Sequence, residues 1–135
     1  MFHILVVDDD KNIRILMKEI LEEENYTVST AADGNAALEV MDKEHIDLVI
    51  LDIMMPNMDG YEFTKVLREC QNDLPILMVS AKQLPADRKK GYRLGIDDYM
   101  SKPVDEEEML LRIKNLLRRA KIVSERRLQI GTVIL

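Results

Sequence analysis

The stretch Asp47-Leu48-Val49-Ile50-Leu51-Asp52-Ile53-Met54-Met55-Pro56 places an aliphatic run between two acids. A second aliphatic run, His3-Ile4-Leu5-Val6-Val7, ends in Asp8-Asp9-Asp10. Runs of four or five aliphatic residues that end in charge or proline are typical of strands buried on both faces of a parallel sheet. We therefore expect Asp52 and the acids at 8–10 at the carboxyl ends of two strands in one sheet, the edge at which open α/β sheets bind ligands.

The length of 135 residues and an apolar fraction of 47% suit one compact domain with an adequate core. No stretch approaches the ~18 consecutive apolar residues of a membrane span, and the run that begins at His3 leaves no room for a signal peptide. We therefore expect a cytoplasmic protein without membrane contact. One cysteine, Cys70, cannot form a disulfide framework, and its place in an apolar helix pattern predicts burial. The net charge of -6 argues against nucleic-acid binding by this chain alone.

Strand and helix patterns alternate five times along the chain. Strands are expected near residues 3–8, 26–31, 47–52, 75–80 and 96–101, and helices near residues 11–24, 34–44, 61–70, 86–94 and 105–120. The fourth helix pattern is mostly polar and contains Gly91, which predicts weak packing. Five consecutive strand–helix units predict a doubly wound α/β fold with a five-stranded parallel sheet, right-handed crossovers and five helices.

Two strand orders are common for such a sheet, and the positions of the acids help to choose between them. In the order 3-2-1-4-5, strand two separates strands one and three, so Asp52 lies roughly 10 Å from Asp8 and Asp9. In the order 2-1-3-4-5 the two strands are neighbours. That order also brings Ser80 beside Asp52 and puts Lys102 one strand further out, within reach of a lysine's stem. We expect the second order because it gathers all of these side chains in one pocket.

Three carboxylates in one pocket repel one another. Two unit charges ~4 Å apart at an effective dielectric constant of about 20 repel by about 4 kcal/mol, so either one acid holds a proton or a cation neutralises the group. The available ligands are hard oxygen atoms, with no thiolate or imidazole nearby, which favours Mg²⁺ over zinc. Because aspartate can accept a phosphoryl group, Asp52 beside Mg²⁺, a hydroxyl and an ammonium is a candidate nucleophile for phosphoryl transfer.

Each of these residues also has an ordinary structural role. Asp9 or Asp10 could cap the first helix. Ser80 could bond to the backbone at a strand end, while Lys102 and Tyr99 could be a solvated lysine and a half-buried aromatic. Their joint placement at one edge of one sheet favours a site over a set of separate structural roles.

Several short motifs resemble the receiver domain of two-component response regulators, in order and in spacing, over about residues 3–120. The motifs are Val6-Val7-Asp8-Asp9, Leu51-Asp52-Ile53-Met54-Met55-Pro56, Met58-Asp59-Gly60, Ser80-Ala81-Lys82 and Gly95-Ile96-Asp97-Asp98-Tyr99-Met100-Ser101-Lys102-Pro103. The resemblance implies a flavodoxin-like, CheY-like fold in which Asp52 accepts a phosphoryl group from a sensor histidine kinase. It also implies that the domain is no enzyme toward other substrates and catalyses only its own Mg²⁺-dependent phosphorylation and dephosphorylation.

The same resemblance implies a role for each site residue. The metal ligands that it implies are Asp8, Asp9, Asp52 and the backbone carbonyl of Met54. Ser80 and Lys102 engage the phosphoryl oxygens, and Tyr99 rotates together with Ser80 as the switch. The peptide bond between Lys102 and Pro103 is usually cis in this family.

Charged residues of the second half look like those of the OmpR/PhoB-type subfamily, which dimerises through the face of helix four, strand five and helix five. The residues that carry this resemblance are Arg88, Asp97, Asp98, Glu108 and Arg112. Phosphorylation is expected to promote a homodimer in which cations of one copy meet acids of the other. Transcription would then be controlled by a winged-helix DNA-binding domain that follows the receiver.

The C-terminal residues are interpreted in the same way. Residues 121–127 have the composition of a basic linker, and Leu128-Gln129-Ile130-Gly131-Thr132-Val133-Ile134-Leu135 resembles the first strand of that winged-helix domain. The chain is therefore interpreted as a fragment, with a receiver domain at 1–120, a linker at 121–127 and, at 128–135, the start of a missing effector domain. DNA contact would come only through that effector domain. The nearest alternative is a single-domain receiver that acts as an adaptor.

Two other classes of protein share parts of this pattern. A haloacid-dehalogenase-type phosphatase also uses an aspartate nucleophile on a doubly wound sheet, but its nucleophile would follow strand one, and the Lys11-Asn12 that follows here does not fit. A flavodoxin-like cofactor protein needs a hydroxyl-rich first loop to hold phosphate, whereas three aspartates would repel it. Steady turnover of a phosphate ester would favour the first alternative, and a yellow, flavin-bearing preparation the second.

Overall fold

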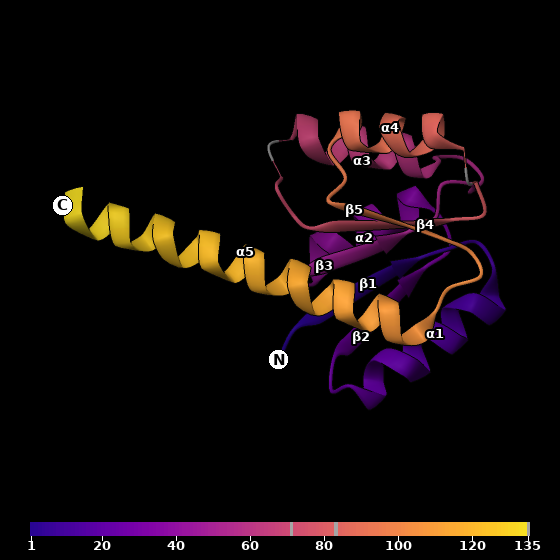
Figure 1. The fold of residues 1–135 in the computed structure, drawn as a ribbon, viewed down its shortest axis with the longest axis horizontal. Helices are drawn as coiled ribbons and strands as arrows, with labels where there is room; N and C mark the ends of the chain where they lie inside the picture. Colours follow the sequence, from indigo (N-terminus) through magenta and orange to yellow (C-terminus); the bar gives the residue numbers. More distant parts are fainter. Residues whose placement is uncertain (71, 83, 135) are drawn as a thin grey trace.

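Five parallel strands form one sheet in the computed structural model (Figure 1). The structure describes the backbone of residues 1–70, 72–82 and 84–134, and the side chains of residues 1–70, 72–82 and 84–122. The strands are β1 (His3–Val7), β2 (Thr27–Ala31), β3 (Leu48–Leu51), β4 (Ile76–Ser80) and β5 (Asp98–Ser101). Their order is β2-β1-β3-β4-β5, which confirms the order predicted from the positions of the acids.

Helices cover both faces of the sheet (Figure 1). They are α1 (Lys11–Glu23), α2 (Gly34–Lys43), α3 (Gly60–Glu69), α4 (Pro85–Leu94) and α5 (Glu106–Ile134). One face of the sheet packs against α1 and α5, and the other against α2, α3 and α4. Apart from the end of α5, each strand and helix begins and ends close to its predicted position, so the doubly wound α/β fold is confirmed.

Successive residues of a strand face opposite helix layers, as the two-residue period of a strand requires. In β1, Ile4 and Val6 belong to the core beneath α1 and α5, whereas Leu5 and Val7 belong to the core beneath α2 and α3. All residues of β3 and β4 are buried, because helices cover both faces of these central strands. The strand ends that carry the candidate site are therefore held by two cores.

Aspartate side chains cap the first three helices. Asp10 accepts a hydrogen bond from the backbone N–H of Asn12 at 2.9 Å and caps α1. Asp33 and Asp59 cap α2 and α3 in the same way. Of the two acids considered as the cap of the first helix, Asp10 has that role, and the exposed Asp9 is available to the site.

The start of α4 has no side-chain cap. Leu84 occupies its N-cap position and makes no side-chain capping hydrogen bond, and of the residues of α4, all of which the structure describes, only Gly91 is buried. The other end is anchored, because Arg68 of α3 donates to the Gly95 carbonyl at 3.0 and 2.8 Å. The weak packing predicted for this helix agrees with the small number of its residues that are buried.

The end of α5 differs from the expectation. The predicted helix ends near residue 120, but the backbone is helical as far as Ile134, through the predicted linker at 121–127 and most of the predicted strand at 128–135. The side chains of residues 123–135 lie outside the described residues, and the assignment of 128–135 to a following domain stays a prediction.

Cys70 is exposed, so its predicted burial is wrong. Cys70 is the C-cap residue of α3, directly after its last residue, Glu69, and the last buried position of the helix is Leu67. The chain leaves the core at that point and the thiol leaves with it. Within the described part of the chain, no helix combines the length and the apolar character needed to cross a membrane.

Candidate functional site

Three acids meet at the carboxyl ends of β1 and β3. Val7 pairs with Leu51 in parallel register, so Asp8 and Asp52, which follow them, lie side by side. The Asp52 amide donates to the Val7 carbonyl at 3.0 Å, which extends this pairing into the site. Asp8, Asp9 and Asp52 each contribute a carboxylate oxygen to a group whose members all lie within 4.8 Å of one another. This is the cluster that the predicted strand order required.

Lys102 reaches these acids from the loop after β5. Its backbone N–H donates to the Ser80 carbonyl at 2.8 Å, which continues the pairing between β4 and β5. Its ammonium donates to Asp8 Oδ2 at 3.0 Å and to Asp52 Oδ2 at 3.3 Å. The peptide bond to Pro103 is cis, as the resemblance implied. The stem of Lys102 therefore spans the width of β4 and holds both acids.

Burial and charge act in opposite directions in this cluster. Asp8 is 4% exposed and Asp52 is 7% exposed. Burial raises the pKa of Asp52 and the charge of Asp8 raises it further, while the charge and hydrogen bond of Lys102 lower it. Burial also acts to lower the pKa of Lys102, but its hydrogen bond to Asp8 and the charges of both acids outweigh burial and raise that pKa. The three acids of the cluster share one bonded cation, the ammonium of Lys102, so negative charge is in excess.

The donor set fits a hard divalent cation. The group consists of carboxylate oxygens alone, which are the ligands that Mg²⁺ prefers. The two buried acids could supply fixed ligands and the exposed Asp9 one from the rim, which would leave room for the water molecules that Mg²⁺ retains. A metal that needs imidazole or thiolate ligands would not be satisfied by these residues.

The turn after β3 shapes the surroundings of Asp52. The backbone of Met54 acts to lower the pKa of Asp52 and so favours the charged carboxylate. Gly60, at the start of α3, donates to the Ile53 carbonyl at 2.8 Å, and a Cβ atom at Gly60 would lie 2.3 Å from the Asp52 backbone oxygen. Only a residue without a side chain allows this approach. Sequence reasoning missed this role of Gly60, although Gly60 belongs to the Met58-Asp59-Gly60 motif. The backbone carbonyl of Met54 as a metal ligand stays a prediction.

Ser80 and Tyr99 lie on the neighbouring strands β4 and β5 and are both buried, at 1% and 5% exposure. The Lys82 N–H donates to Ser80 Oγ at 3.2 Å, and the Tyr99 hydroxyl donates to the Lys82 carbonyl. Burial raises the pKa of Tyr99, while its hydrogen bond with Ser80 lowers it. The residues predicted to form a switch thus both contact the loop between β4 and α4, and Tyr99 is more buried than an ordinary half-buried aromatic.

Comparison with known proteins places this geometry in a family. The family model described as the response regulator receiver domain matches residues 4–114. This chain belongs to that family. The alkaline phosphatase synthesis transcriptional regulatory protein PhoP of Bacillus subtilis (strain 168) is 45% identical over 121 residues, which are 90% of this receiver chain and 50% of PhoP. The transcriptional regulatory protein CpxR of Escherichia coli (strain K12) is 43% identical over 117 residues, 87% of this chain and 50% of CpxR.

Other relatives agree in sequence and in fold. The heme response regulator HssR of Staphylococcus epidermidis (strain ATCC 12228 / FDA PCI 1200) is 36% identical over 135 residues, 100% of this chain and 60% of HssR, so the receiver chain spans roughly half of such relatives. The solved receiver domain of the Francisella response regulator 1452 has a TM-score of 0.85 and 32% identity, and covers 89% of this chain and 99% of its own. PhoP, MprA and CpxR are OmpR/PhoB-type response regulators, which confirms the subfamily resemblance.

Several charges that were predicted to form a dimer face are paired within the receiver. Arg112 of α5 donates to Asp98 of β5 at 2.6 Å and to Glu108 at 2.8 Å. Asp97 faces the other helix layer, where Arg68 of α3 donates to it at 3.1 Å. The predicted face therefore contains one intrachain network around Arg112, while Asp97 belongs to a separate contact with α3.

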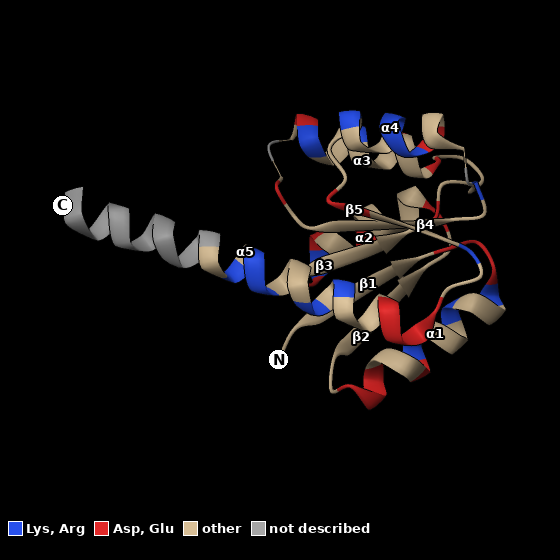
Figure 2. Cartoon of the chain, viewed as in Figure 1, with Lys and Arg blue, Asp and Glu red and all other residues tan. Residues whose placement is uncertain are grey.

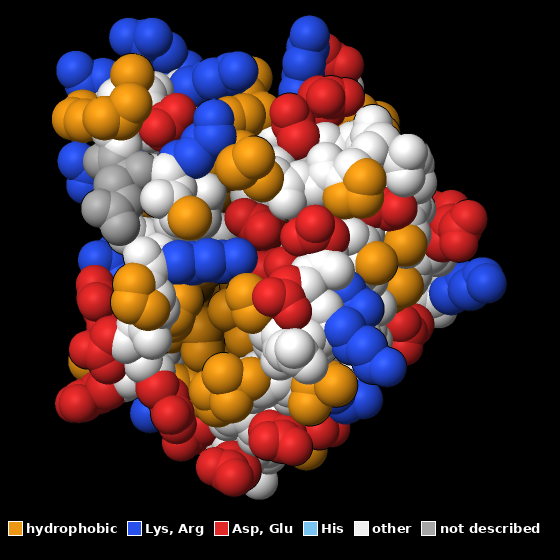
Figure 3. Space-filling model, turned by 90° about the vertical axis from the view of Figure 1, so that its right-hand side faces the viewer, with side chains coloured by type: hydrophobic (Ala, Val, Ile, Leu, Met, Phe, Trp, Pro, Cys, Tyr) orange, Lys and Arg blue, Asp and Glu red, His pale blue; other side chains and the backbone are white. Residues whose placement is uncertain are grey.

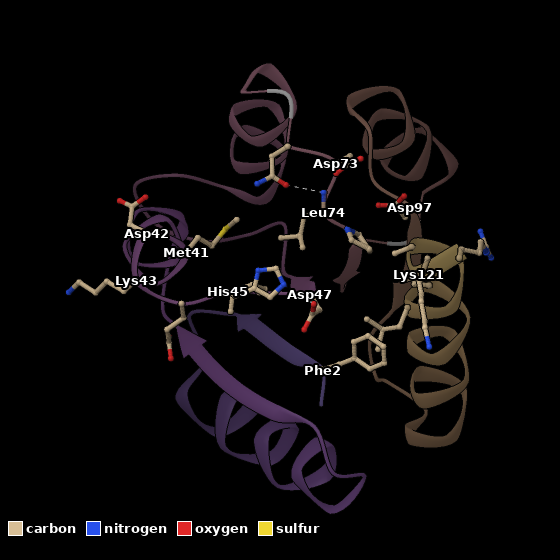
Figure 4. Close-up of a pocket in the computed structure, with 18 residues that line it drawn as sticks. Phe2, Met41, Asp42, Lys43, His45, Asp47, Asp73, Leu74, Asp97 and Lys121 are labelled. Atoms are coloured by element: carbon tan, nitrogen blue, oxygen red, sulfur yellow. Dashed lines mark hydrogen bonds and ion pairs between the residues drawn. The ribbon is translucent and has the colours of Figure 1, made fainter. Parts of the chain in front are cut away.

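Two hollows open at opposite edges of the sheet. The smaller, of about 590 Å³, adjoins the acid cluster and is lined by Asp9, Lys82 and Lys90, among others. Acidic side chains gather near the centre of this face of the molecule, with Lys and Arg side chains beyond them on the side of α4 (Figure 3). The larger hollow, of about 930 Å³, lies at the amino ends of the strands, between residues such as Phe2 and Lys121 (Figure 4). Only the smaller hollow includes a member of the acid cluster, so size does not mark the functional site.

Proposed function

We propose that this receiver accepts a phosphoryl group on Asp52 from a sensor histidine kinase, in a reaction that requires Mg²⁺. The observation that carries the proposal is the buried Asp52 carboxylate, held by Lys102 at 3.3 Å beside two further acids. Burial limits the water around the attacking oxygen, and the fixed ammonium holds the carboxylate in place. An arrangement of this kind is suited to an aspartate nucleophile and is unfavourable for a purely structural acid.

The metal ligands in this proposal are Asp8, Asp9, Asp52 and the backbone carbonyl of Met54. When bound, Mg²⁺ supplies the positive charge that allows a phosphate to approach three acids. A carboxylate oxygen of Asp52 attacks phosphorus, the bond between phosphorus and the donor breaks, and the leaving group takes the bonding electron pair. Water later hydrolyses the acyl phosphate and restores Asp52. The domain therefore catalyses its own phosphorylation and dephosphorylation and turns over no other substrate.

Lys102 and Ser80 are placed to hold the phosphorylated product. The new phosphoryl oxygens bring negative charge to the ammonium of Lys102, which in this structure bonds Asp8 and Asp52. Ser80 Oγ accepts a hydrogen bond from the Lys82 amide, so its own proton can be donated to the phosphoryl group. Movement of Ser80 would change its contact with Tyr99 and displace the loop that leads into the start of α4, which has no side-chain cap.

Dimerisation through α4, β5 and α5 is the proposed output of this switch. Lys and Arg residues, among them the exposed Arg88, occur along α4, and the first turn of α5 is acidic (Figure 2). In a symmetric dimer Arg112 would exchange its own Asp98 and Glu108 for those of a second copy. Exposed ion pairs contribute about 0.2–1 kcal/mol each, so this exchange specifies the surface more than it stabilises the dimer. Asp97, already bonded to α3, contributes least to that face.

The proposed docking surface for the kinase lies on α1, directly after the acids. Ile15 and Leu16 of this helix are 49% and 56% exposed. Two adjacent exposed aliphatic residues beside a charged site offer an apolar surface to the helix of a partner. Their position would bring the donor phosphohistidine of the kinase close to Asp52.

Control of transcription is proposed from the relatives. PhoP and CpxR are named transcriptional regulatory proteins, and this chain spans half of each. The alignment with HssR continues through residue 135. A winged-helix domain that follows the receiver would make the DNA contact, because the net charge of -6 disfavours such contact by this chain alone.

Intact-mass measurement after treatment with a small phosphodonor tests the proposal. The parent chain should gain one phosphoryl group with Mg²⁺ present and none with EDTA, because the acids repel phosphate until a cation is bound. Asp52→Asn should gain none, and Asp10→Asn, which changes the neighbouring acid that caps α1, should label like the parent. Labelling of Asp52→Asn at the level of the parent would overturn the proposal.

A further inference from the structure

The hollow of about 590 Å³ adjoins the acid cluster that contains the proposed phosphoacceptor, because Asp9 lines it, whereas Asp52 itself does not. Asp9, a member of the acid cluster, and Met54, two positions after Asp52, line the hollow. Lys82 and Lys90 also line the hollow, together with a further acid, Asp59. A molecule that brings a phosphoryl group to Asp52 through this hollow would therefore place its remaining atoms close to these two lysines.

Lys90 differs from Lys82 in its surroundings. The Lys82 ammonium lies 3.9 Å from the carboxylate of Asp87, which offsets part of its charge. The Lys90 ammonium lies 4.4 Å from the centroid of the Tyr61 ring, and within the described residues it forms no ion pair. Tyr61 is 7% exposed and donates to the Asp87 carbonyl at 3.0 Å, so the ring that carries Lys90 is fixed. A ring contact orients a cation without neutralising it.

Phosphoryl transfer proceeds with the attacking and leaving groups on opposite sides of phosphorus. The hollow adjoins the site through Asp9 and Met54, so a leaving group that departs from Asp52 toward it comes close to the lysines that line it. We propose that Lys90 is a specificity-determining residue that favours phosphodonors whose leaving group is a carboxylate. This inference rests on the proposed function of Asp52. It assigns to α4 a part in the choice of donor as well as in the output of the switch.

The chemistry of two small donors separates the effect of Lys90 from a general effect. With acetyl phosphate, an Asp52 oxygen forms the new bond to phosphorus, the bond from phosphorus to the acyl oxygen breaks, and acetate leaves with the electron pair and a full negative charge. With phosphoramidate, an Asp52 oxygen forms the same bond and the bond from phosphorus to nitrogen breaks. The nitrogen is protonated and positively charged in the donor, and it leaves with the electron pair as neutral ammonia. A nearby ammonium attracts the first leaving group and repels the second donor's nitrogen.

The test compares the labelling rates of the full chain with acetyl phosphate and with phosphoramidate, by intact mass at one Mg²⁺ concentration. Lys90→Gln should label about two- to fivefold more slowly with acetyl phosphate, the range for one partly solvated charge, and at an unchanged or higher rate with phosphoramidate. Lys90→Arg should restore the ratio of the two rates. Lys89→Gln removes the adjacent exposed lysine, which does not line the hollow, and should leave the ratio unchanged.

High salt should reduce the difference between Lys90→Gln and the parent, because it screens an exposed charge. Both rates are measured on the same variant, so a partial loss of folding lowers them equally and leaves their ratio unchanged. A ratio in Lys90→Gln equal to that of the parent, or an equal change in Lys89→Gln, would overturn the role of Lys90 alone. Absence of labelling of the parent by either donor would overturn the proposed function of Asp52 and this inference with it.

Discussion

Lys102 donates a 3.3 Å hydrogen bond to Asp52, although β4 lies between the strands that the two residues follow. The same ammonium bonds Asp8 at 3.0 Å, so it is shared by two buried acids. One cation cannot balance three carboxylates, and the site keeps an excess of negative charge until a metal ion binds. This relationship explains why the site should need Mg²⁺ and why its stability should depend on the charge of Asp52.

Asp52→Asn should stabilise the fold at neutral pH in the absence of Mg²⁺. Burial and the charge of Asp8 raise the pKa of Asp52 above its ordinary value of 3.8, so the folded state binds the proton more tightly than the unfolded state. The free energy of unfolding of the parent therefore falls as pH rises through the interval between 3.8 and the raised value. Asparagine does not titrate, and its advantage in the free energy of unfolding should be complete above that interval.

Urea unfolding of the parent and of Asp52→Asn at pH 7 and at an acid pH measures this difference. The advantage of the variant should shrink at acid pH, where Asp52 is protonated in both the folded and the unfolded parent. A variant that is less stable than the parent at pH 7 would show that the Asp52 charge is stabilising and would contradict the electrostatic account of the site.

Mg²⁺ should raise the melting temperature of the parent and have less effect on Asp9→Ala. A ligand that binds only the folded state stabilises it by about 2.7 kcal/mol at a concentration of 100 times its Kd. Asp10→Ala is the matched control, because it removes the adjacent acid, which caps α1. That variant should lose about 1 kcal/mol of stability yet retain the full response to Mg²⁺. An equal response in Asp9→Ala and the parent would remove Asp9 from the ligand set.

Lys102→Ala should fold in the presence of Mg²⁺ but should not transmit phosphorylation to the switch. Loss of the ammonium leaves a phosphoryl oxygen without its cation and should weaken the displacement of Ser80 and Tyr99. NMR shifts of Tyr99 and α4, recorded with and without beryllofluoride as a phosphoryl mimic, measure the coupling. Lys65→Ala, at an exposed site on α3, serves as the control. Identical shifts in Lys102→Ala and the parent would exclude the proposed role.

Phosphorylation should promote a dimer that Arg112→Glu prevents. In the monomer Arg112 bonds Asp98 and Glu108, and a glutamate there would repel both acids in the same chain and in a second copy. A shift from mostly monomer to mostly dimer takes about 5.5 kcal/mol of differential stabilisation, which the contacts of the phosphoryl group would have to supply. Sedimentation velocity with and without the mimic measures the shift. Lys43→Glu on α2 should dimerise like the parent, and a dimer that survives Arg112→Glu would place the interface elsewhere.

The fold and the acid cluster could be predicted because they depend on patterns within single segments. Continuous aliphatic runs that end in acids identify buried parallel strands, and the need to bring Asp8 and Asp52 together selects one strand order. Lys102 was placed by the same argument, because its stem is long enough to cross one strand. The cis bond before Pro103 came instead from the family resemblance.

Other features depend on contacts between segments, and no period in the sequence reports them. Arg112 pairs with Asp98 and so joins α5 to β5. From the sequence alone, this contact within one chain could not be distinguished from the same contact between two copies. Lys90 contacts Tyr61 across α3 and α4, which a polar helix pattern does not indicate. The helix predicted to end near residue 120 continues as far as Ile134, and the assignment of 128–135 to a following domain stays a prediction.

The central claim is that Asp52 alone forms the acyl phosphate, and chemical mapping of the modified residue tests it most directly. Borohydride reduces an aspartyl phosphate to homoserine, which a peptide mass spectrum locates at a single position. After phosphorylation with Mg²⁺ and reduction, we expect homoserine at position 52 and unchanged aspartate at positions 8 and 9, whose carboxylates hold the metal in this account. Homoserine at position 8 or 9, with position 52 unmodified, would contradict it.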